Sequence, residues 1–211
     1  MKARQICFVT DRNRTRDRPL LEVIEAAIAG GIDLLQIREK DMGAGELLEL
    51  VRAAREAVKR ARSRCRIVVN DRLDVALAAG ADGVHLPAEG LPIHEVKCRA
   101  KGRFVIGRSV HAPAEAREAA AAGADYLFFG PVFETASKAA FGEPQGTPAL
   151  RKLVGAVRLP VWAIGGISRE TIAGLADIPV AGVAAISAIG TADDPTGAVR
   201  TLRALLDAPP V

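Results

Sequence analysis

The sequence is poor in aromatic residues and contains few cysteines. Phe, Trp and Tyr make up 4% of its 211 residues, and no Lys/Arg run alternates with aromatic side chains. Because proteins commonly hold single-stranded nucleic acid by stacking bases on aromatic rings, the composition predicts no nucleic-acid partner. Cys7, Cys65 and Cys98 lie far apart without a Cys-x-x-Cys spacing, which predicts reduced thiols in a cytoplasmic protein and no zinc site.

Long apolar runs and targeting signals are also missing. No stretch is long enough to span a membrane, and the first few residues lead directly into a short apolar strand without a signal peptide. No Gly-x-Gly-x-x-Gly follows that strand, which weakens the case for a dinucleotide-binding fold. With no linker or low-complexity segment, we expect one cytoplasmic domain over residues 1–211 without a membrane partner. The sequence leaves open whether the protein forms a homo-oligomer.

The chain does contain a regular alternation of short apolar strands and Ala-rich amphipathic helices. We predict strands at residues 6–10, 32–37, 67–70, 83–86, 104–109, 126–130, 161–165 and 182–187. Helices are predicted at residues 20–29, 44–62, 73–79, 92–100, 113–122, 148–157, 170–176 and 195–206. Eight strand–helix units in about 200 residues predict a TIM (β/α)8 barrel, an α/β fold whose active sites lie at the carboxyl ends of the strands. A doubly wound open sheet is the alternative.

Residues 36–40, Gln-Ile-Arg-Glu-Lys, break the apolar pattern of the second strand. Side chains alternate along a strand, so Gln36, Arg38 and Lys40 are expected on the inner face. An amide and two cations inside a packed sheet cost free energy unless an anion meets them. Because Arg offers a bidentate fork and Lys a compact charge, this segment predicts a phosphate-bearing ligand. The formal net charge of +4 suits the same class of ligand.

Most of the other predicted strands also end in polar or glycine-rich residues. These are Asn70 and Asp71 after the third strand, Ser109 and His111 after the fifth, Thr135, Ser137 and Lys138 in the loop after the sixth, Gly165 and Gly166 after the seventh, and Ile186 and Ser187 at the eighth. In a barrel these positions meet at one end, where glycines let backbone amides approach an anion closely. We expect His111 to face this end, and His85 to be a hydrogen-bonded residue of the core.

Simpler interpretations stay open for each of these features taken alone. The Asn-Asp pair could cap the following helix, and the Gly-Gly pair could form a tight turn. The loop after the sixth strand could be an ordinary solvated loop. The first loop contains Arg12, Arg14, Arg16 and Arg18, which could form a solvated segment or could draw phosphates toward the barrel mouth.

Taken in order, these segments resemble the thiamine phosphate synthase and TenI superfamily over nearly the whole chain. The matching segments are residues 36–40, 70–77, 81–86, 109–111, 130–138, 163–167 and 183–189. For the synthase branch, the resemblance implies an enzyme of thiamine biosynthesis that joins hydroxymethylpyrimidine diphosphate to thiazole phosphate. The products would be thiamine phosphate and pyrophosphate, and Mg²⁺ would be the cofactor.

The resemblance also implies a role for each residue. It assigns the pyrimidine diphosphate to Gln36, Arg38, Lys40 and Asn70, Mg²⁺ to Asp71, and the leaving pyrophosphate to Ser109 and Lys138. It assigns the thiazole phosphate to Thr135 and Ser137, together with the backbone at Gly166, Ile186 and Ser187. The thiazole nitrogen would attack the pyrimidine methylene cation, a step that needs no strong general base.

Two departures from the synthase pattern keep a second branch in view. Synthases usually carry an Asp, which is a second magnesium ligand, at the position of Gly90 in this chain. They usually carry a Pro at the position of Glu134, and the Glu of this chain is more typical of the TenI branch. TenI-type thiazole tautomerases use a histidine that matches His111. Thiamine phosphate synthase is the leading hypothesis, and a thiazole tautomerase or a non-catalytic ligand-binding or regulatory barrel is the alternative.

Overall fold

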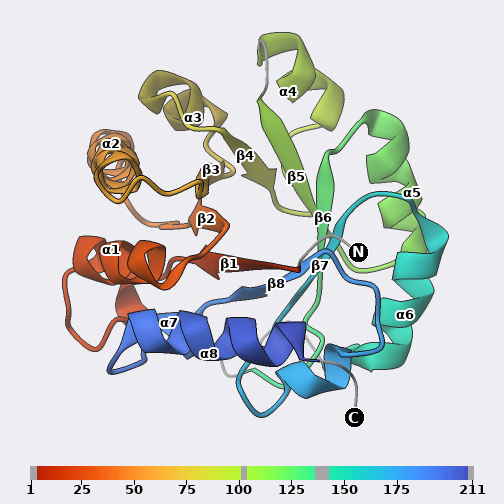
Figure 1. Cartoon of the computed structure of the whole chain (residues 1–211). Helices are drawn as coiled ribbons and strands as arrows, with labels where there is room; N and C mark the ends of the chain where they lie inside the picture. Colours follow the sequence, from red (N-terminus) through yellow and green to blue (C-terminus); the bar gives the residue numbers. More distant parts are fainter. Residues whose placement is uncertain (1–3, 101–103, 136–142, 209–211) are drawn as a thin grey trace.

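Eight parallel strands close into a barrel in the order of the sequence (Figure 1). The computed structural model describes residues 4–100, 104–135 and 143–208. The strands are β1 (Gln5–Val9), β2 (Leu34–Ile37), β3 (Arg66–Asn70), β4 (Gly83–Leu86), β5 (Val105–Val110), β6 (Tyr126–Phe129), β7 (Val161–Ile164) and β8 (Gly182–Ala185). Each pairs with the next, and β8 pairs with β1. The predicted TIM barrel is confirmed, and the alternative of an open sheet is wrong.

Helices surround the barrel, as Figure 1 shows. They are α1 (Leu20–Gly30), α2 (Ala44–Arg60), α3 (Leu73–Ala79), α4 (Ile93–Arg99), α5 (Pro113–Ala122), α6 (Gly146–Ala156) and α8 (Pro195–Asp207), with the short η1 (Arg12–Arg14), η3 (Ile172–Leu175) and α7 (Ser187–Gly190). Two helices, α5 and α8, begin at a proline, whose fixed φ suits the first helical position. Within the described ranges, no helix is long and apolar enough to cross a bilayer.

Three of the predicted elements need correction. The helix expected at residues 170–176 is the four-residue 3-10 turn η3, since Gly174 lies within it and Pro179 follows closely, and both residue types disfavour a longer helix. The strand expected at residues 182–187 ends at Ala185, and Ser187 begins α7. Helix α6 begins two residues before Pro148, so this proline lies inside the first turn and does not open the helix.

The interior of the barrel is packed with side chains. The inward-facing cluster contains Cys7, Val9, Leu34, Val68, Tyr126, Phe128, Trp162 and Ala184. The ring centroids of Tyr126, Phe128 and Trp162 lie 5.4–6.2 Å from one another, so three of the few aromatic residues fill the space that the strands enclose. A larger cluster packs the outer faces of the strands against the helices. A ligand therefore has to bind above this interior, at the carboxyl ends of the strands.

Three aspartates tie neighbouring strands together at the amino end of the barrel. Asp33, Asp82 and Asp125 each come directly before an even-numbered strand and accept a hydrogen bond from a backbone N–H of the strand before it. The donors are Ile6, Ile67 and Ile106, at N–O distances of 2.7–2.8 Å. Ala181 holds the same place before β8, where its N–H donates to the carbonyl of Val161. The fourth pair of strands therefore lacks this side-chain link.

Replacing Asp82 by alanine is expected to lower the free energy of unfolding by about 1–2 kcal/mol, because the N–H of Ile67 loses its charged acceptor. Urea unfolding followed by circular dichroism measures the change. Asp177→Ala is the matched control, since that carboxylate pairs with the exposed Arg151 and exposed pairs contribute little. An equal loss in both variants would show that the link in the barrel adds nothing beyond surface charge.

Candidate active site

Gln36 and Asn70 form a buried polar contact at the carboxyl ends of β2 and β3. The Gln36 Nε2 donates to Asn70 Oδ1 at 3.0 Å, and the Gln36 side chain is 2% exposed. Its Oε1 is buried and has no hydrogen-bond partner in the described part of the protein. An unsatisfied buried acceptor costs about 1–3 kcal/mol. The structure therefore keeps an amide oxygen ready for a donor on a ligand.

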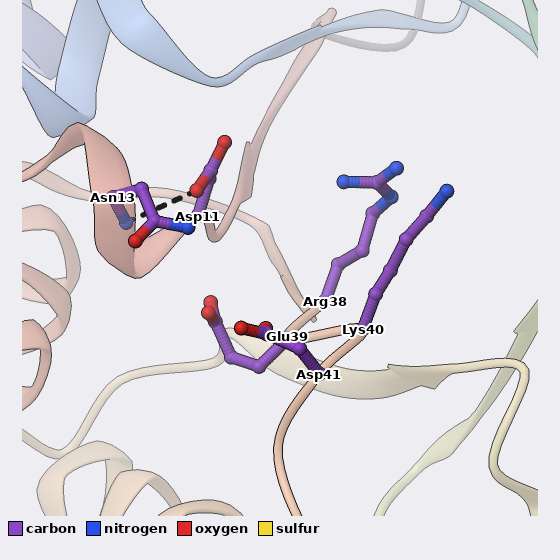
Figure 2. Close-up of a pocket in the computed structure, with 6 residues that line it drawn as sticks. All are labelled: Asp11, Asn13, Arg38, Glu39, Lys40 and Asp41. Carbon is purple, nitrogen blue, oxygen red and sulfur yellow. Dashed lines mark hydrogen bonds between the residues drawn. The ribbon is translucent and has the colours of Figure 1, made fainter.

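Arg38 and Lys40 extend side by side from the loop after β2 (Figure 2). Because β2 ends at Ile37, the two cations stand on a loop and not on the strand itself. Together with Asn13 and the carboxylates of Asp11, Glu39 and Asp41 they line a pocket of about 160 Å³. Burial lowers the pKa of Arg38, and the nearby carboxylates of Asp11 and Glu39 raise it. A guanidinium stays charged at neutral pH in any case, so the pocket presents two cations beside its three acidic side chains.

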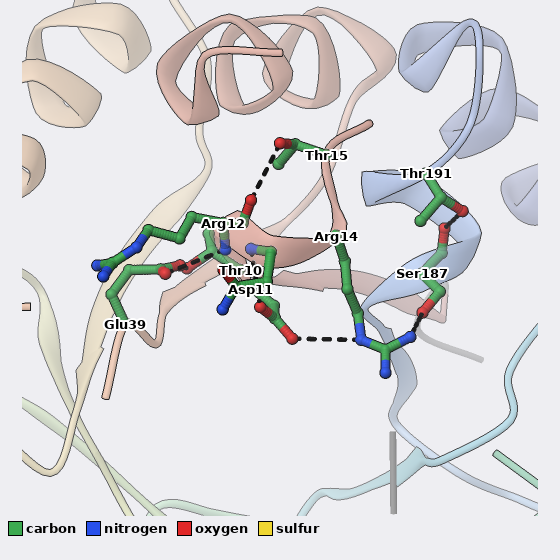
Figure 3. Close-up of polar contacts among 9 residues, drawn as sticks. Thr10, Asp11, Arg12, Arg14, Thr15, Glu39, Ser187 and Thr191 are labelled. Atoms are coloured by element: carbon green, nitrogen blue, oxygen red, sulfur yellow. Dashed lines mark hydrogen bonds and ion pairs between the residues drawn. The ribbon is translucent and has the colours of Figure 1, made fainter. Parts of the chain in front are cut away.

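A buried carboxylate holds the backbone that carries Arg38. The Thr10 hydroxyl donates to Glu39 Oε1 at 2.6 Å and accepts from the N–H of Arg38 at 2.9 Å. The N–H of Arg12 donates to Glu39 Oε2 at 3.0 Å (Figure 3). Burial raises the pKa of Glu39, and the hydrogen bonds from Thr10 and Arg12 oppose that effect. From the sequence, no role was assigned to Glu39. A role could have been suspected from its position, because it is a charged residue within the unusual segment 36–40.

The arginines of the first loop are largely tied to the protein. Arg18 donates to the carbonyls of Thr15, Gly190, Ala192 and Asp193. Arg12 and Arg16 pair with Asp41 and Asp193. Arg12 and Arg18 are therefore held by the protein, whereas Arg16 and its partner Asp193 are exposed to solvent.

Arg14 is the member of this group that reaches the residues expected to bind phosphate. Its Nη1 donates to Ser187 Oγ at 3.3 Å, and its Nε lies 3.3 Å from Asp11 Oδ2 (Figure 3). The contact joins the first loop to the start of α7. It places a cation beside Ser187, which sequence reasoning had assigned only to backbone contacts.

Asp71 combines an unusual backbone conformation with a carboxylate that no described side chain holds by a hydrogen bond. Its side chain makes no hydrogen bond or ion pair with any described residue, and its φ is +61°. Left-handed backbone at a residue other than glycine is uncommon and concentrates at functional sites. The residue before α3 is Arg72, and no side chain caps that helix. The capping interpretation of the Asn70-Asp71 pair is therefore wrong.

Arg108 holds the loop in which a second magnesium ligand would be expected. Its guanidinium donates to the carbonyls of Ala88 at 2.8 Å and Leu91 at 3.0 Å. Burial lowers the pKa of Arg108, and the nearby Asp71 raises it. Gly90 has no side chain to offer, and a Cβ there would lie 2.8 Å from Pro87 Cδ. No group of three or more His, Cys, Asp or Glu side chains that could hold a metal occurs in the described ranges.

The two histidines near the mouth differ in their surroundings. His85 is 1% exposed, with its Nδ1 3.0 Å from Tyr126 Oη and its Nε2 2.9 Å from Ser109 Oγ, which confirms the expected hydrogen-bonded core histidine. The exposed His111 has its Nδ1 2.8 Å from the carbonyl of Gly130. Because a carbonyl only accepts, Nδ1 carries a hydrogen, and the neutral ring keeps a basic lone pair on Nε2.

The glycines after β7 allow a close approach of two loops. Gly165 and Gly166 have φ of +96° and +66°. A Cβ on Gly166 would overlap the carbonyl oxygen of Glu134 and lie 2.7 Å from Phe133 Cβ. The pair is thus more than a tight turn, because it lets the loop that leads to Thr135 pack against it. Ser137 and Lys138 lie outside the described residues.

Comparisons with known proteins agree on one family. The family model described as thiamine monophosphate synthase matches residues 6–189. A putative thiamine-phosphate synthase of Geobacter sulfurreducens is 46% identical over 94% of this chain and 92% of its own length. The thiamine-phosphate synthase of Moorella thermoacetica is 42% identical over 88% of both. A thiamine phosphate pyrophosphorylase from Pyrococcus furiosus superposes with a TM-score of 0.86 at 36% identity, covering 96% of this chain and 95% of that one.

Proposed function

The chain belongs to the thiamine monophosphate synthase family, and we propose that it joins hydroxymethylpyrimidine diphosphate to thiazole phosphate, forming thiamine phosphate and pyrophosphate. The observation that carries this proposal is the buried Oε1 of Gln36, which has no partner among the described residues, together with the two cations at residues 38 and 40. An amide acceptor suits an N–H on the pyrimidine, and the cations suit the diphosphate beside it. One domain over residues 1–211 would hold both phosphorylated substrates in the cytoplasm.

Charge on the leaving group sets the requirements of the reaction. Breaking the carbon–oxygen bond of the diphosphate leaves negative charge on pyrophosphate, which Arg38 and Lys40 stabilise more strongly than they do the ground state. Lys138, assigned from the sequence, would add a third cation. The thiazole nitrogen attacks with a lone pair that it already holds, so no residue has to remove a proton first.

Asp71 is the residue that would hold Mg²⁺. Its carboxylate makes no hydrogen bond with any described residue, and one or two carboxylates with substrate phosphate oxygens are a common way in which proteins bind this ion. A site with one carboxylate fits an ion that arrives with the diphosphate. When bound, Mg²⁺ would neutralise charge on the leaving group.

The thiazole phosphate is assigned to the opposite side of the mouth, at the ends of β7 and β8. There the backbone at Gly165, Gly166, Ile186 and Ser187 would approach the phosphate closely, with hydroxyls from Thr135 and Ser137. The Arg14 guanidinium, which contacts the Ser187 hydroxyl, would supply the positive charge that this half of the site otherwise takes from backbone amides.

A direct assay tests the proposal. Purified protein is given both substrates with Mg²⁺, and in parallel the thiazole carboxylate phosphate whose double bond a tautomerase would shift. We expect thiamine phosphate and pyrophosphate to form in equal amounts. Isomerisation without coupling would overturn the proposal in favour of the tautomerase, and neither reaction would favour a binding protein.

His111→Asn separates the two enzyme activities, because the free Nε2 lone pair of His111 is the observation that favours a tautomerase. Coupling needs no strong base, so we expect the variant to keep most of its coupling activity. Any isomerisation should disappear, since an amide cannot shuttle the proton. His94→Asn, at an exposed position on α4, is the control. If the variant lost both reactions equally, or kept both, this separation of roles would be contradicted.

A further inference from the structure

Tyr126 is a buried tyrosine that the proposed reaction does not use. Its side chain projects into the barrel interior, and its hydroxyl has one hydrogen-bond partner among the described residues, Nδ1 of His85 at 3.0 Å. The strand register places the two in one row, since His85 on β4 is paired with Gly107 on β5 and Gly107 with Tyr126 on β6. The hydrogen bond therefore passes over the strand between them.

Gly107 makes this hydrogen bond sterically feasible. A Cβ on Gly107 would overlap the ring carbon Cζ and the hydroxyl oxygen of Tyr126, and would lie 2.6 Å from His85 Nδ1. Any larger residue would occupy the space in which the two side chains meet. Three consecutive strands thus carry the histidine (β4), the glycine that leaves room for the contact (β5) and the tyrosine (β6).

The Tyr126–His85 contact has a definite direction. Burial raises the pKa of Tyr126 well above its usual value, so the phenol keeps its proton. A buried hydroxyl that donated to nothing would be costly, and Nδ1 of His85 is the acceptor within reach. Because Nδ1 then accepts, the hydrogen of the neutral imidazole sits on Nε2, which donates to Ser109 Oγ at 2.9 Å.

Ser109 is left with a hydrogen to donate. Its oxygen accepts from His85, and its own hydroxyl hydrogen has no acceptor among the described residues. Ser109 is half-buried at the carboxyl end of β5, the end at which the site lies. The hydroxyl can therefore donate to an anion in the mouth.

We propose that Tyr126, acting through His85, fixes the Ser109 hydroxyl as a hydrogen-bond donor to the pyrophosphate group in the mouth. Tyr126 and His85 are positioning residues that do not touch the substrate. The inference rests on the proposed function for the identity of the anion, whereas the direction of the relay is argued from the contacts among Tyr126, His85 and Ser109. Because the Ser109 oxygen accepts from His85, its hydroxyl hydrogen stays directed at the leaving group, and the oxygen lone pairs do not face the anion.

Nitrogen-15 NMR of the histidine rings tests the direction of the relay without any substrate. We expect His85 to carry its hydrogen on Nε2, and His111, whose Nδ1 faces a carbonyl, to carry it on Nδ1. The two rings in one spectrum should thus show opposite tautomers, with each ring assigned by its loss in an Asn variant. Finding the hydrogen of His85 on Nδ1 would overturn the proposal, whatever the enzyme's activity.

A double-mutant cycle tests whether Tyr126 acts through Ser109. Tyr126→Phe and Ser109→Ala are each expected to weaken binding of inorganic pyrophosphate, and to lower kcat by about tenfold if the coupling reaction occurs. In the Ser109→Ala background, Tyr126→Phe should have no further effect on either quantity. Calorimetry with pyrophosphate provides the readout even if the protein catalyses another reaction.

Trp162→Phe is the control for the cycle, because it alters the same interior cluster without removing a partner of His85. It should lower stability without coupling to Ser109. Effects of Tyr126→Phe that add fully to those of Ser109→Ala would show that the tyrosine only packs, and would overturn the relay.

Discussion

Replacing Arg38 by alanine is expected to lower kcat by about 100-fold, or about 3 kcal/mol of transition-state stabilisation, while the fold is retained. The guanidinium stands on a loop at the pocket and contributes to neither hydrophobic cluster, so its loss removes anion stabilisation and not packing. Steady-state kinetics with both substrates measures kcat, and near-ultraviolet circular dichroism shows whether the fold is retained. Lys138→Ala is expected to behave in the same way.

Two further variants make the Arg38 result specific. Arg38→Lys keeps the charge but loses the bidentate fork, so its activity should lie between wild type and Arg38→Ala. Arg52→Ala removes an exposed arginine of α2 that pairs with Glu49, and it should leave kcat unchanged. Near-normal turnover by a well-folded Arg38→Ala protein would contradict the assignment of the diphosphate to this loop.

Replacing Gly166 by alanine is expected to reduce kcat/KM for thiazole phosphate by about 100-fold, because displacing a substrate-positioning loop by about 1 Å can cost that much. The new Cβ would overlap the carbonyl oxygen of Glu134, and the loop toward Thr135 would have to move. The KM for the pyrimidine diphosphate should stay close to the wild-type value, since that substrate is assigned to β2 and β3. Varying each substrate in turn separates the two effects.

Gly31→Ala is the matched control for backbone strain. Gly31 has φ of +94° and nothing within 4 Å of its built Cβ, so alanine there adds about 1 kcal/mol of strain without a collision. It should lower stability and leave the kinetics intact. If Gly166→Ala did no more than this control, the close approach at residue 166 would have no part in binding.

The fold was predictable because its signals are local. Alternating apolar strands and amphipathic helices defined the eight units, and β4 was predicted with its observed bounds. The prediction failed for residues 170–176, where Gly174 and Pro179 lie near an otherwise helical pattern and only a 3-10 turn forms. It also failed at Ser187, where a strand pattern runs on into α7 without a break in composition.

The site was predictable only in part, because some of its contacts join distant segments. Arg38 and Lys40 stood out because cations do not belong in a buried strand. Thr10 with Glu39, and Arg14 with Ser187, are 29 and 173 residues apart, and their meeting depends on how the barrel closes. The Tyr126 contact depends on the register of three strands, which the sequence pattern does not specify.

The aspartate links at the amino end of the barrel imply that local opening is uneven around the ring. Three strand pairs are fastened by a side chain, and the fourth, β7 with β8, has Ala181 in that place. Ligand-binding segments are commonly drawn from the parts of a protein that open at low cost. The pair without an aspartate link, β7 with β8, also carries Gly166 and Ser187 at its carboxyl ends. Local opening between these two strands would therefore allow a bound phosphate group to leave while the three linked pairs stay closed.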